Sequence, residues 1–365
     1  MEIKQQHPGT ILFFRMGDFY ELFHEDAEVA APVLGLALTS RDKNAKNPIP
    51  MAGFPWHALE DNLRIMLKSG FKVTVAEQEK ELREGAKLLE RVVTRIYTPG
   101  SLYEESLLNS SERSVLSSIV LAKSSLSMAI IDSSTGESWA STWMDDERFS
   151  SLEDELLRWN PAEIVISPKD AENDQLCTIF ANLSDCVISQ HSVNKKRRIE
   201  RLETILEVSD LGHLDLDNSP LSIEAAGFAA DYLAEVHFKQ NIPLRDLQIV
   251  EETGHLVVDQ TTLRNLEITN TLSGEYDGSL ISSMNYCRTA MGRRLMKTWL
   301  LRPLHQIEAI ELRHNAVKTL KSSSKRLDML RQSLTGLRDL ERLSTQLAYN
   351  RSNARDLLAT ALALE

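Results

Sequence analysis

The stretch Ile11-Leu-Phe-Phe-Arg-Met-Gly-Asp-Phe-Tyr-Glu-Leu-Phe23 decides how the first hundred residues are organised. Its apolar start, Ile11 to Phe14, is typical of a buried strand, and Gly17-Asp18 is typical of a break. An amphipathic helix is predicted after the break, because apolar residues follow at helical spacing: Tyr20, Phe23, Ala27, Ala30 and Leu34. We therefore expect Phe19 and Glu21 at a strand-to-helix turn, where a rigid scaffold presents side chains to a partner.

Two structural interpretations of the same residues stay open. Asp18 followed three residues later by Glu21 has the spacing of a helix capping box. Phe19 stands four residues before Phe23 and would, on such a helix, extend the apolar stripe into the core.

The run from Phe14 to Phe23 resembles the signature of the mismatch-recognition domain in the MutS family of bacterial DNA mismatch repair proteins. Further motifs of that family follow in the correct order: Pro50-Met-Ala-Gly-Phe-Pro-Trp-His-Ala58, Glu77-Gln-Glu79, Arg95, Thr98-Pro-Gly100, Leu263-Arg-Asn-Leu-Glu-Ile268 and Met291-Gly-Arg-Arg-Leu-Met-Lys-Thr-Trp-Leu300. These blocks are long and spread over the whole chain, so the resemblance is specific.

The resemblance implies a set of DNA-binding residues and partners. The mismatch reader of the family, Phe-x-Glu, corresponds to Phe19 and Glu21, with Arg15 and Met16 as neighbouring DNA contacts. A polar loop adds possible contacts to the DNA backbone from Arg41, Lys43 and Lys46. The implied partners are double-stranded DNA with mismatches or small loops, a second copy in a full-length homodimer, and a MutL-like repair protein.

Composition places the chain among ordinary globular proteins, with 42% hydrophobic and 26% charged residues in 365. No apolar run approaches the roughly 20 residues of a membrane helix, and the first residues lack a secretory signal pattern. Three cysteines make neither a disulfide framework nor a zinc site, which suits a reducing compartment: Cys177, Cys186 and Cys287. We expect a cytoplasmic protein with no membrane partner.

The net charge of −12 is unevenly distributed. Residues 101–254 carry 12 basic and 28 acidic side chains, a net charge of −16, whereas residues 1–100 carry −1 and residues 255–365 carry +5. Composition alone would not indicate a nucleic-acid partner, because such domains are usually basic. The acidic middle segment favours a surface that faces away from phosphates.

The spacing of strand and helix signals predicts a multidomain protein of mixed α/β and all-α parts. Residues 1–100 are predicted to form a mixed α/β domain, with a helix from about Ala58 to Ser69 and strands at Phe71–Ala76 and Val92–Tyr97. The resemblance implies that this is the mismatch-recognition domain. The charged segment from Glu77 to Glu90 is predicted to be helical. Residues 101–113 form a polar linker.

Residues 114–240 are predicted to form a connector domain with a ribonuclease H-like fold. Three meander strands precede two alternating α/β units. Their expected strands are Val115–Leu121, Met128–Asp132, Glu137–Trp143, Glu163–Ser167 and Cys186–Gln190. The resemblance implies a connector that binds the MutL-like partner without catalysis. An alternative is a magnesium-dependent nuclease with Asp132 and Glu163 as ligands, although no third carboxylate joins them.

Two groups of polar residues receive structural interpretations. His57 has no second ligand at metal-binding spacing. The basic run Lys195-Lys-Arg-Arg198, with Arg201, leads a helix whose apolar stripe is Ile199, Leu202, Ile205 and Leu206, so we expect a solvated face.

Residues 241–365 are predicted to begin the helical core from which the family's lever arms rise. Helices are expected up to Gly274, at Leu280–Leu301, at Ile307–Leu320 and at Leu327–Ser333. We expect a turn at Gly292-Arg293-Arg294, its arginines pairing with helix ends. The pattern stops inside a helix and no phosphate-binding loop occurs, which predicts a truncated chain that is not itself an enzyme. ATP and magnesium are expected only in a domain beyond residue 365. A non-catalytic interaction scaffold is the remaining alternative.

Overall fold

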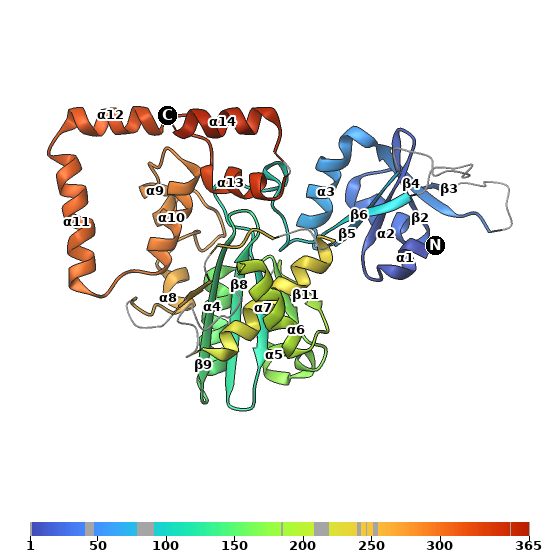
Figure 1. Ribbon diagram of the computed structural model, residues 1–365, viewed down its shortest axis with the longest axis horizontal. Coiled ribbons are helices and arrows are strands. Elements are labelled where there is room, and N and C mark those ends of the chain that lie inside the picture. The colour runs from blue at the N-terminus through green and yellow to red at the C-terminus, as the bar shows by residue number, and fades with distance from the viewer. Residues whose placement is uncertain are drawn as a thin grey trace.

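The structure is a computed structural model and describes residues 2–40, 47–78, 91–183, 185–207, 219–238, 242–245, 247–250, 255–350 and 352–364. Figure 1 shows a first α/β body, a second α/β body beside it, and a set of helices on the other side of the second body. The predicted order of two mixed α/β parts followed by helices is therefore confirmed.

The first body contains a six-stranded mixed sheet in the order β3-β4-β2-β1-β5-β6. Its strands are β1 (Ile11–Met16), β2 (Phe19–Phe23), β3 (Thr39–Ser40), β4 (Pro50–Pro55), β5 (Val73–Gln78) and β6 (Arg91–Tyr97). Its helical elements are α1 (Glu2–Gln6), α2 (His24–Leu34), the 3-10 turn η1 (Trp56–Ala58) and α3 (Leu59–Lys68). The apolar sides of α2 and α3 pack on one face of the sheet (Figure 1).

The prediction of a helix over Phe19 to Phe23 is wrong. These residues form β2, which pairs antiparallel with β1 on one side and with β4 on the other. Helix α2 begins only at His24, and no side chain caps its start, so the capping box of Asp18 and Glu21 does not form. Two neighbouring strands satisfy the backbone here, and this pairing overrides the helical spacing.

Glu77 and Gln78 also differ from the prediction. They are the last residues of β5 rather than the start of a helix. The rest of that expected helix, from residue 79 to residue 90, lies outside the described residues.

The second body has three layers, and we keep for it the name connector from the prediction. Its sheet has the order β11-β10-β7-β8-β9-β12, with an antiparallel meander of β7 (Leu116–Leu121), β8 (Ser125–Asp132) and β9 (Glu137–Met144). The two further strands that were predicted are β10 (Glu163–Ile166) and β11 (Val187–Gln190), and the structure shows that they continue the sheet in parallel. Strand β12 (Leu247–Ile249) adds an edge strand that was not predicted. The ribonuclease H-like assignment stays a prediction.

Helices cover both faces of the connector sheet. Helices α4 (Arg148–Trp159) and α5 (Asp174–Ala181) pack on one face, and α6 (Lys195–Leu206) and α7 (Pro220–Val236) on the other. Helices α6 and α7 approach closely at Gly227, where an added Cβ would lie 2.1 Å from the Arg198 carbonyl oxygen. A side chain at this position would separate the two helices.

The basic run on α6 is not simply a solvated face. Leu202 and Ile205 are buried as predicted, but the arginines pair with acids on α7. Arg197 and Arg201 reach one Asp231 oxygen at 2.9 and 3.4 Å, and Arg198 reaches Glu224 at 3.1 Å. The acids are distant in the sequence, so the pattern on α6 alone could not reveal them.

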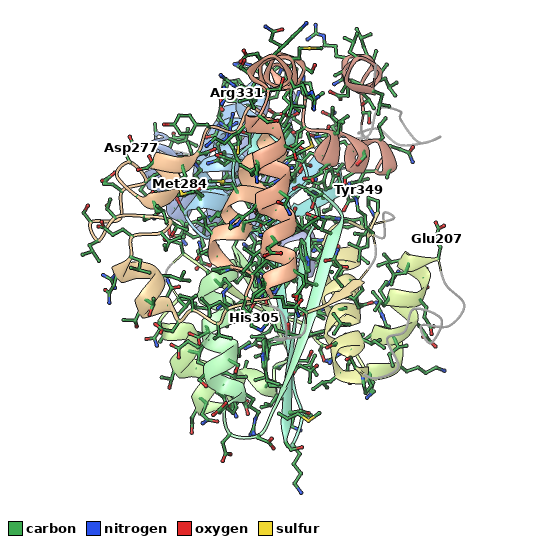
Figure 2. The ribbon with its side chains drawn as sticks, turned by 90° about the vertical axis from the view of Figure 1, so that its left-hand side faces the viewer. Glu207, Asp277, Met284, His305, Arg331 and Tyr349 are labelled. Atoms are coloured by element: carbon green, nitrogen blue, oxygen red, sulfur yellow. The ribbon has the colours of Figure 1, made fainter. Side chains whose placement is uncertain are left out.

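The third part is helical, and several of its predicted boundaries are wrong. The segment after α8 (Gln260–Asn265) is not helical between Glu267 and Gly274, and the expected long helix is divided into α9 (Leu280–Met284) and α10 (Ala290–Leu301). The remaining helices are α11 (Ile307–Lys321), α12 (Ser324–Leu334), α13 (Leu340–Ala348) and α14 (Ala354–Leu364). Figure 2 shows α11 rising from near His305 to α12, which carries Arg331.

Arg294 pairs with a helix start, as predicted, although it lies inside α10 rather than in a turn. The Thr289 hydroxyl accepts a hydrogen bond from the Gly292 amide at 3.0 Å and begins that helix. The Arg294 guanidinium binds both carboxylate oxygens of Asp339, the N-cap of α13, at 2.6 and 2.8 Å. This bidentate pair joins α10 to α13.

The predicted linker is held by arginines of the third part. Arg342 donates to the carbonyls of Asn109 and Glu112 at 3.0 and 2.7 Å, and Arg294 donates to the carbonyl of Ser110 at 3.3 Å. The backbone between the first two domains is therefore fixed by the helical part that follows them in the sequence.

Glu163 joins the first domain to the connector. Its buried carboxylate accepts hydrogen bonds from the Gly100 amide at 3.2 Å, from the Tyr232 hydroxyl at 2.6 Å and from the Ser189 hydroxyl. The Lys72 ammonium lies 3.4 Å from the same carboxylate. An added Cβ at Gly100 would lie only 2.8 Å from the Glu163 Cβ, so only glycine allows this approach.

His237 lies at the same junction and stays neutral. Its Nε2–H donates to the Ser101 carbonyl at 2.9 Å. Burial and the neighbouring Arg95 lower the pKa of His237 to about 3. In the unfolded chain the pKa would be about 6.5, so between these values the unfolded state binds the extra proton.

We therefore predict that stability falls as the pH drops below about 6.5. At pH 5 the His237 contribution to this loss is about 2 kcal/mol, because protonation of the unfolded chain favours unfolding. His237→Gln, which retains a donor for Ser101, should remove that part of the pH dependence. Urea unfolding at pH 7.5 and pH 5 measures the difference, with His57→Gln as the exposed control. Equal pH slopes for His237→Gln and the unmodified protein would contradict the prediction.

Candidate functional site

The β1–β2 hairpin has two different faces. In its register Phe14 lies opposite Glu21, Arg15 opposite Tyr20 and Met16 opposite Phe19. Side chains of a strand alternate between faces, so Phe14, Met16, Phe19 and Glu21 share one face of the sheet. We call this face the reading face; it includes Gly53 and Pro55 of β4, which lie opposite Glu21 and Phe19.

The opposite face of β2 is the core face. Tyr20 is 1% exposed and Leu22 is fully buried, and their neighbours Phe13 and Phe54 pack edge to face at 4.9 Å. Phe19, in contrast, is 48% exposed. The interpretation of Phe19 as a core residue is therefore wrong, and its ring is accessible to a partner.

Tyr20 stabilises the reading face from the opposite, core face of the sheet. Its hydroxyl donates to the Glu77 carboxylate on β5, which ties β2 to a strand two positions away in the sheet. Burial and this hydrogen bond raise the pKa of Tyr20, so the hydroxyl keeps its proton. Phe19 and Glu21 consequently flank a residue whose side chain is fixed.

Arg15 does not join the other predicted contacts. It lies on the face of Tyr20, with its guanidinium carbon 5.3 Å from the centroid of the Tyr20 ring and 5.2 Å from that of the Trp56 ring. These three side chains border a hollow of about 520 Å³ at the end of the hairpin. The structure thus separates Arg15 from Met16, Phe19 and Glu21.

Arg91 is a further residue of the reading-face region. Its guanidinium carbon lies 5.6 Å from the Phe14 ring centroid, and one nitrogen lies 3.6 Å from the Met16 sulfur. It belongs to β6, 75 residues from Met16 in the sequence. No local pattern marks it, because only the pairing of β1, β5 and β6 brings it to this face.

The remaining predicted residues fall into two groups. Arg41, Lys43 and Lys46 lie outside the described residues. His57 is exposed on η1, and within the described ranges no group of three His, Cys, Asp or Glu side chains could hold a metal ion.

The two carboxylates of the nuclease alternative have structural partners. Asp132 accepts hydrogen bonds from the amide and the hydroxyl of Ser134 at 2.9 and 2.6 Å, and Arg113 lies 3.5 Å away. Glu163 binds the domain junction described above. The nuclease interpretation therefore has no support from the described residues.

Models of three protein domains match the chain in sequence order. They are MutS domain I over residues 1–106, MutS domain II over residues 114–245 and MutS domain III over residues 261–365. No helix among the described residues is both long and apolar enough to cross a membrane.

Curated relatives resemble the chain over almost its whole length. "DNA mismatch repair protein MutS" of Acaryochloris marina is 35% identical and aligns with all of the chain, which covers 42% of that relative. The proteins of the same name from Nostoc punctiforme and Halothermothrix orenii are each 34% identical over 99% and 98% of the chain, which covers 42% and 40% of them. The chain spans about two fifths of the length of these relatives.

The fold, the three domain models and the curated relatives together define a multidomain protein of the mismatch repair class. More specifically, the chain belongs to the MutS family and contains its domains I, II and III.

Proposed function

We propose that this chain recognises mismatched or looped duplex DNA in mismatch repair by inserting Phe19 next to the mispaired base, with Glu21 in contact with that base. The main support is that Phe19 is 48% exposed on the same face as Glu21, two residues further along one strand. The pleat alone accounts for the Phe-x-Glu spacing, because residues i and i+2 of a strand point in the same direction.

The physical basis of discrimination is the compliance of the DNA. A mispair is less firmly stacked than its neighbours, so unstacking and bending cost less there. An aromatic wedge in the minor groove then stacks on the displaced base and gains roughly 1–3 kcal/mol. At a paired site the same wedge meets a higher deformation cost. Stacking does not depend on base identity, so one site accepts many mismatches.

Glu21 adds discrimination through repulsion. A carboxylate close to phosphates disfavours binding at every site, whereas a hydrogen bond to an exposed base edge compensates only at a mismatch. Among the described residues no hydrogen bond or ion pair occupies the Glu21 carboxylate. Glu21 is also partly exposed on this face, which supports a contact with a base.

The assembly and activity of the whole protein are proposals too. In a full-length homodimer, one copy would insert Phe19 and the other would contact only the backbone. ATP hydrolysis with magnesium would belong to a part of such a protein outside this chain. A MutL-like partner would bind the acidic connector.

Phe19→Ala should abolish most of the preference for mismatched over matched duplex, a loss of about tenfold or more, because it removes the stacking ring. The melting temperature should change by only a few degrees, because the ring is not part of the core. Both quantities are measured on the full-length gene product, by fluorescence anisotropy with paired duplexes and by calorimetry.

Phe13→Ala is the matched control. It removes the same side chain from the core face of the adjacent strand, where the ring is fully buried. This variant should lose about 3–5 kcal/mol of stability. If Phe19→Ala instead melted early and still discriminated, Phe19 would be a structural residue and the scaffold alternative would be favoured.

Glu21→Ala should weaken discrimination by strengthening the binding of matched duplex. Removal of the negative charge should raise the affinity for matched duplex several-fold and change the affinity for mismatched duplex less. Glu60→Gln, an exposed charge removal on α3, is the control and should leave the ratio unchanged. A fall in affinity for both duplexes, without the rise for matched DNA, would exclude the repulsive role.

Neutralising an acidic turn should test partner binding by the connector. Asp145, Asp146 and Glu147 are exposed just before α4, and changing them to Asn, Asn and Gln should weaken binding of a MutL-like protein about tenfold or more. Mismatch affinity should not change. The control is Glu308→Gln with Glu311→Gln on α11. Equal effects on partner and DNA binding would refute a dedicated partner surface at this turn.

A further inference from the structure

Gly53 occupies an unusual position on the reading face. It lies inside β4, directly opposite Glu21 in the antiparallel pairing of β2 and β4, and it is exposed. Residues directly opposite in such a pair place their side chains next to each other on one face. Any side chain at position 53 would therefore stand beside Glu21.

The backbone does not require glycine at this position. Gly53 does not adopt the positive φ of Gly17 and Gly35, a backbone conformation that favours glycine. Glycine inside a strand weakens it, because it adds conformational freedom to the unfolded chain and has no side chain to pack. Glycine in a strand often marks a place where a ligand approaches the backbone closely.

The surroundings of Gly53 show what an added side chain would meet. An added Cβ would lie 3.0 Å from the Tyr20 carbonyl oxygen, 3.7 Å from the Glu21 Cγ and 3.8 Å from the Glu21 Cα. The first contact is tight and needs a shift of a few tenths of an ångström. All three atoms belong to β2. A larger side chain at position 53 would therefore extend away from them, outward over the reading face.

We infer that Gly53 keeps the space beside Glu21 open for a nucleotide of the mispaired DNA, so that the size of residue 53 controls access of a displaced base to the Glu21 carboxylate. This inference rests on the proposed function. Phe19 supplies stacking, Glu21 supplies the polar contact, and Gly53 supplies the room in which base and deoxyribose reach that contact. A bulky residue 53 would block the polar contact and leave the Phe19 ring in place.

The test uses the full-length gene product with Gly53→Ala and Gly53→Val, and two duplexes that differ only in one mispair. Gly53→Ala should lower the affinity for the mismatched duplex a few-fold and Gly53→Val about tenfold or more. The affinity for the matched duplex should change by less than twofold. Thr94→Val, an exposed position on β6 at the far edge of the same sheet, is the control and should change neither affinity.

Combining Gly53→Val with Glu21→Ala identifies the space that the new side chain fills. Truncating Glu21 widens the same gap, so the two changes should be non-additive and the double variant should recover part of the mismatch affinity lost in Gly53→Val. Full additivity would mean that the two positions act on different parts of the DNA and would overturn the inference.

Two further outcomes would also overturn it. A folded Gly53→Val protein that keeps its mismatch preference would show that the space is unused, while the Phe19→Ala result would still support the proposed function. A large fall in melting temperature for both glycine variants, with an unchanged preference, would assign Gly53 to the contact with the Tyr20 oxygen. An unmodified protein that does not discriminate at all would instead refute the proposed function.

Discussion

The buried carboxylate of Glu163 is the interaction on which the arrangement of the first two domains depends. A charge without solvent must be paired and hydrogen-bonded, or it strongly destabilises the fold. Its donors come from both domains: Gly100 and Lys72 from the first, Ser189 and Tyr232 from the connector. Separating the domains would expose these groups to solvent or leave them without hydrogen-bond partners. The sheet that carries the reading face is therefore held in a defined position on the connector.

The second constraint is the pleat of β2. Because β2 pairs with β1 and β4, its side chains alternate between the two faces of the sheet. Tyr20 and Leu22 are buried and define the core face. Phe19 and Glu21 therefore face the same way without any helix or special turn. The same pairing places Gly53 opposite Glu21, so three residues from two strands form one surface.

Most of the connector was predictable because its strands carry apolar or alternating runs separated by clear turns, and each expected strand agrees with an observed one within a few residues. The strand at Phe19–Phe23 was not predictable. A stretch of only five residues with apolar side chains at Tyr20 and Phe23 fits a helix as well as a strand. The boundaries near α9 and α10 were wrong for another reason. The side chains of Ser279 and Thr289 cap two separate helices, and the residues between Met284 and Ala290 are not helical, although the apolar spacing of Leu280–Leu301 fits one long helix. The helices expected at Ile307–Leu320 and Leu327–Ser333 agree with α11 and α12 within a few residues.

By itself the sequence determined the order of the domains, most connector strands, and Phe19 and Glu21 as the pair to consider, since local apolar runs and motifs record these directly. Only the tertiary structure decided that the pair lies on a strand, that Arg15 points to the other face, and that Arg91 and Gly53 border the reading face. It also assigned Glu163 and the arginines of α6 to ion pairs. The reason is physical: strand pairing and buried charge pairs join residues that are distant in the chain, and local periodicity contains no record of such partners.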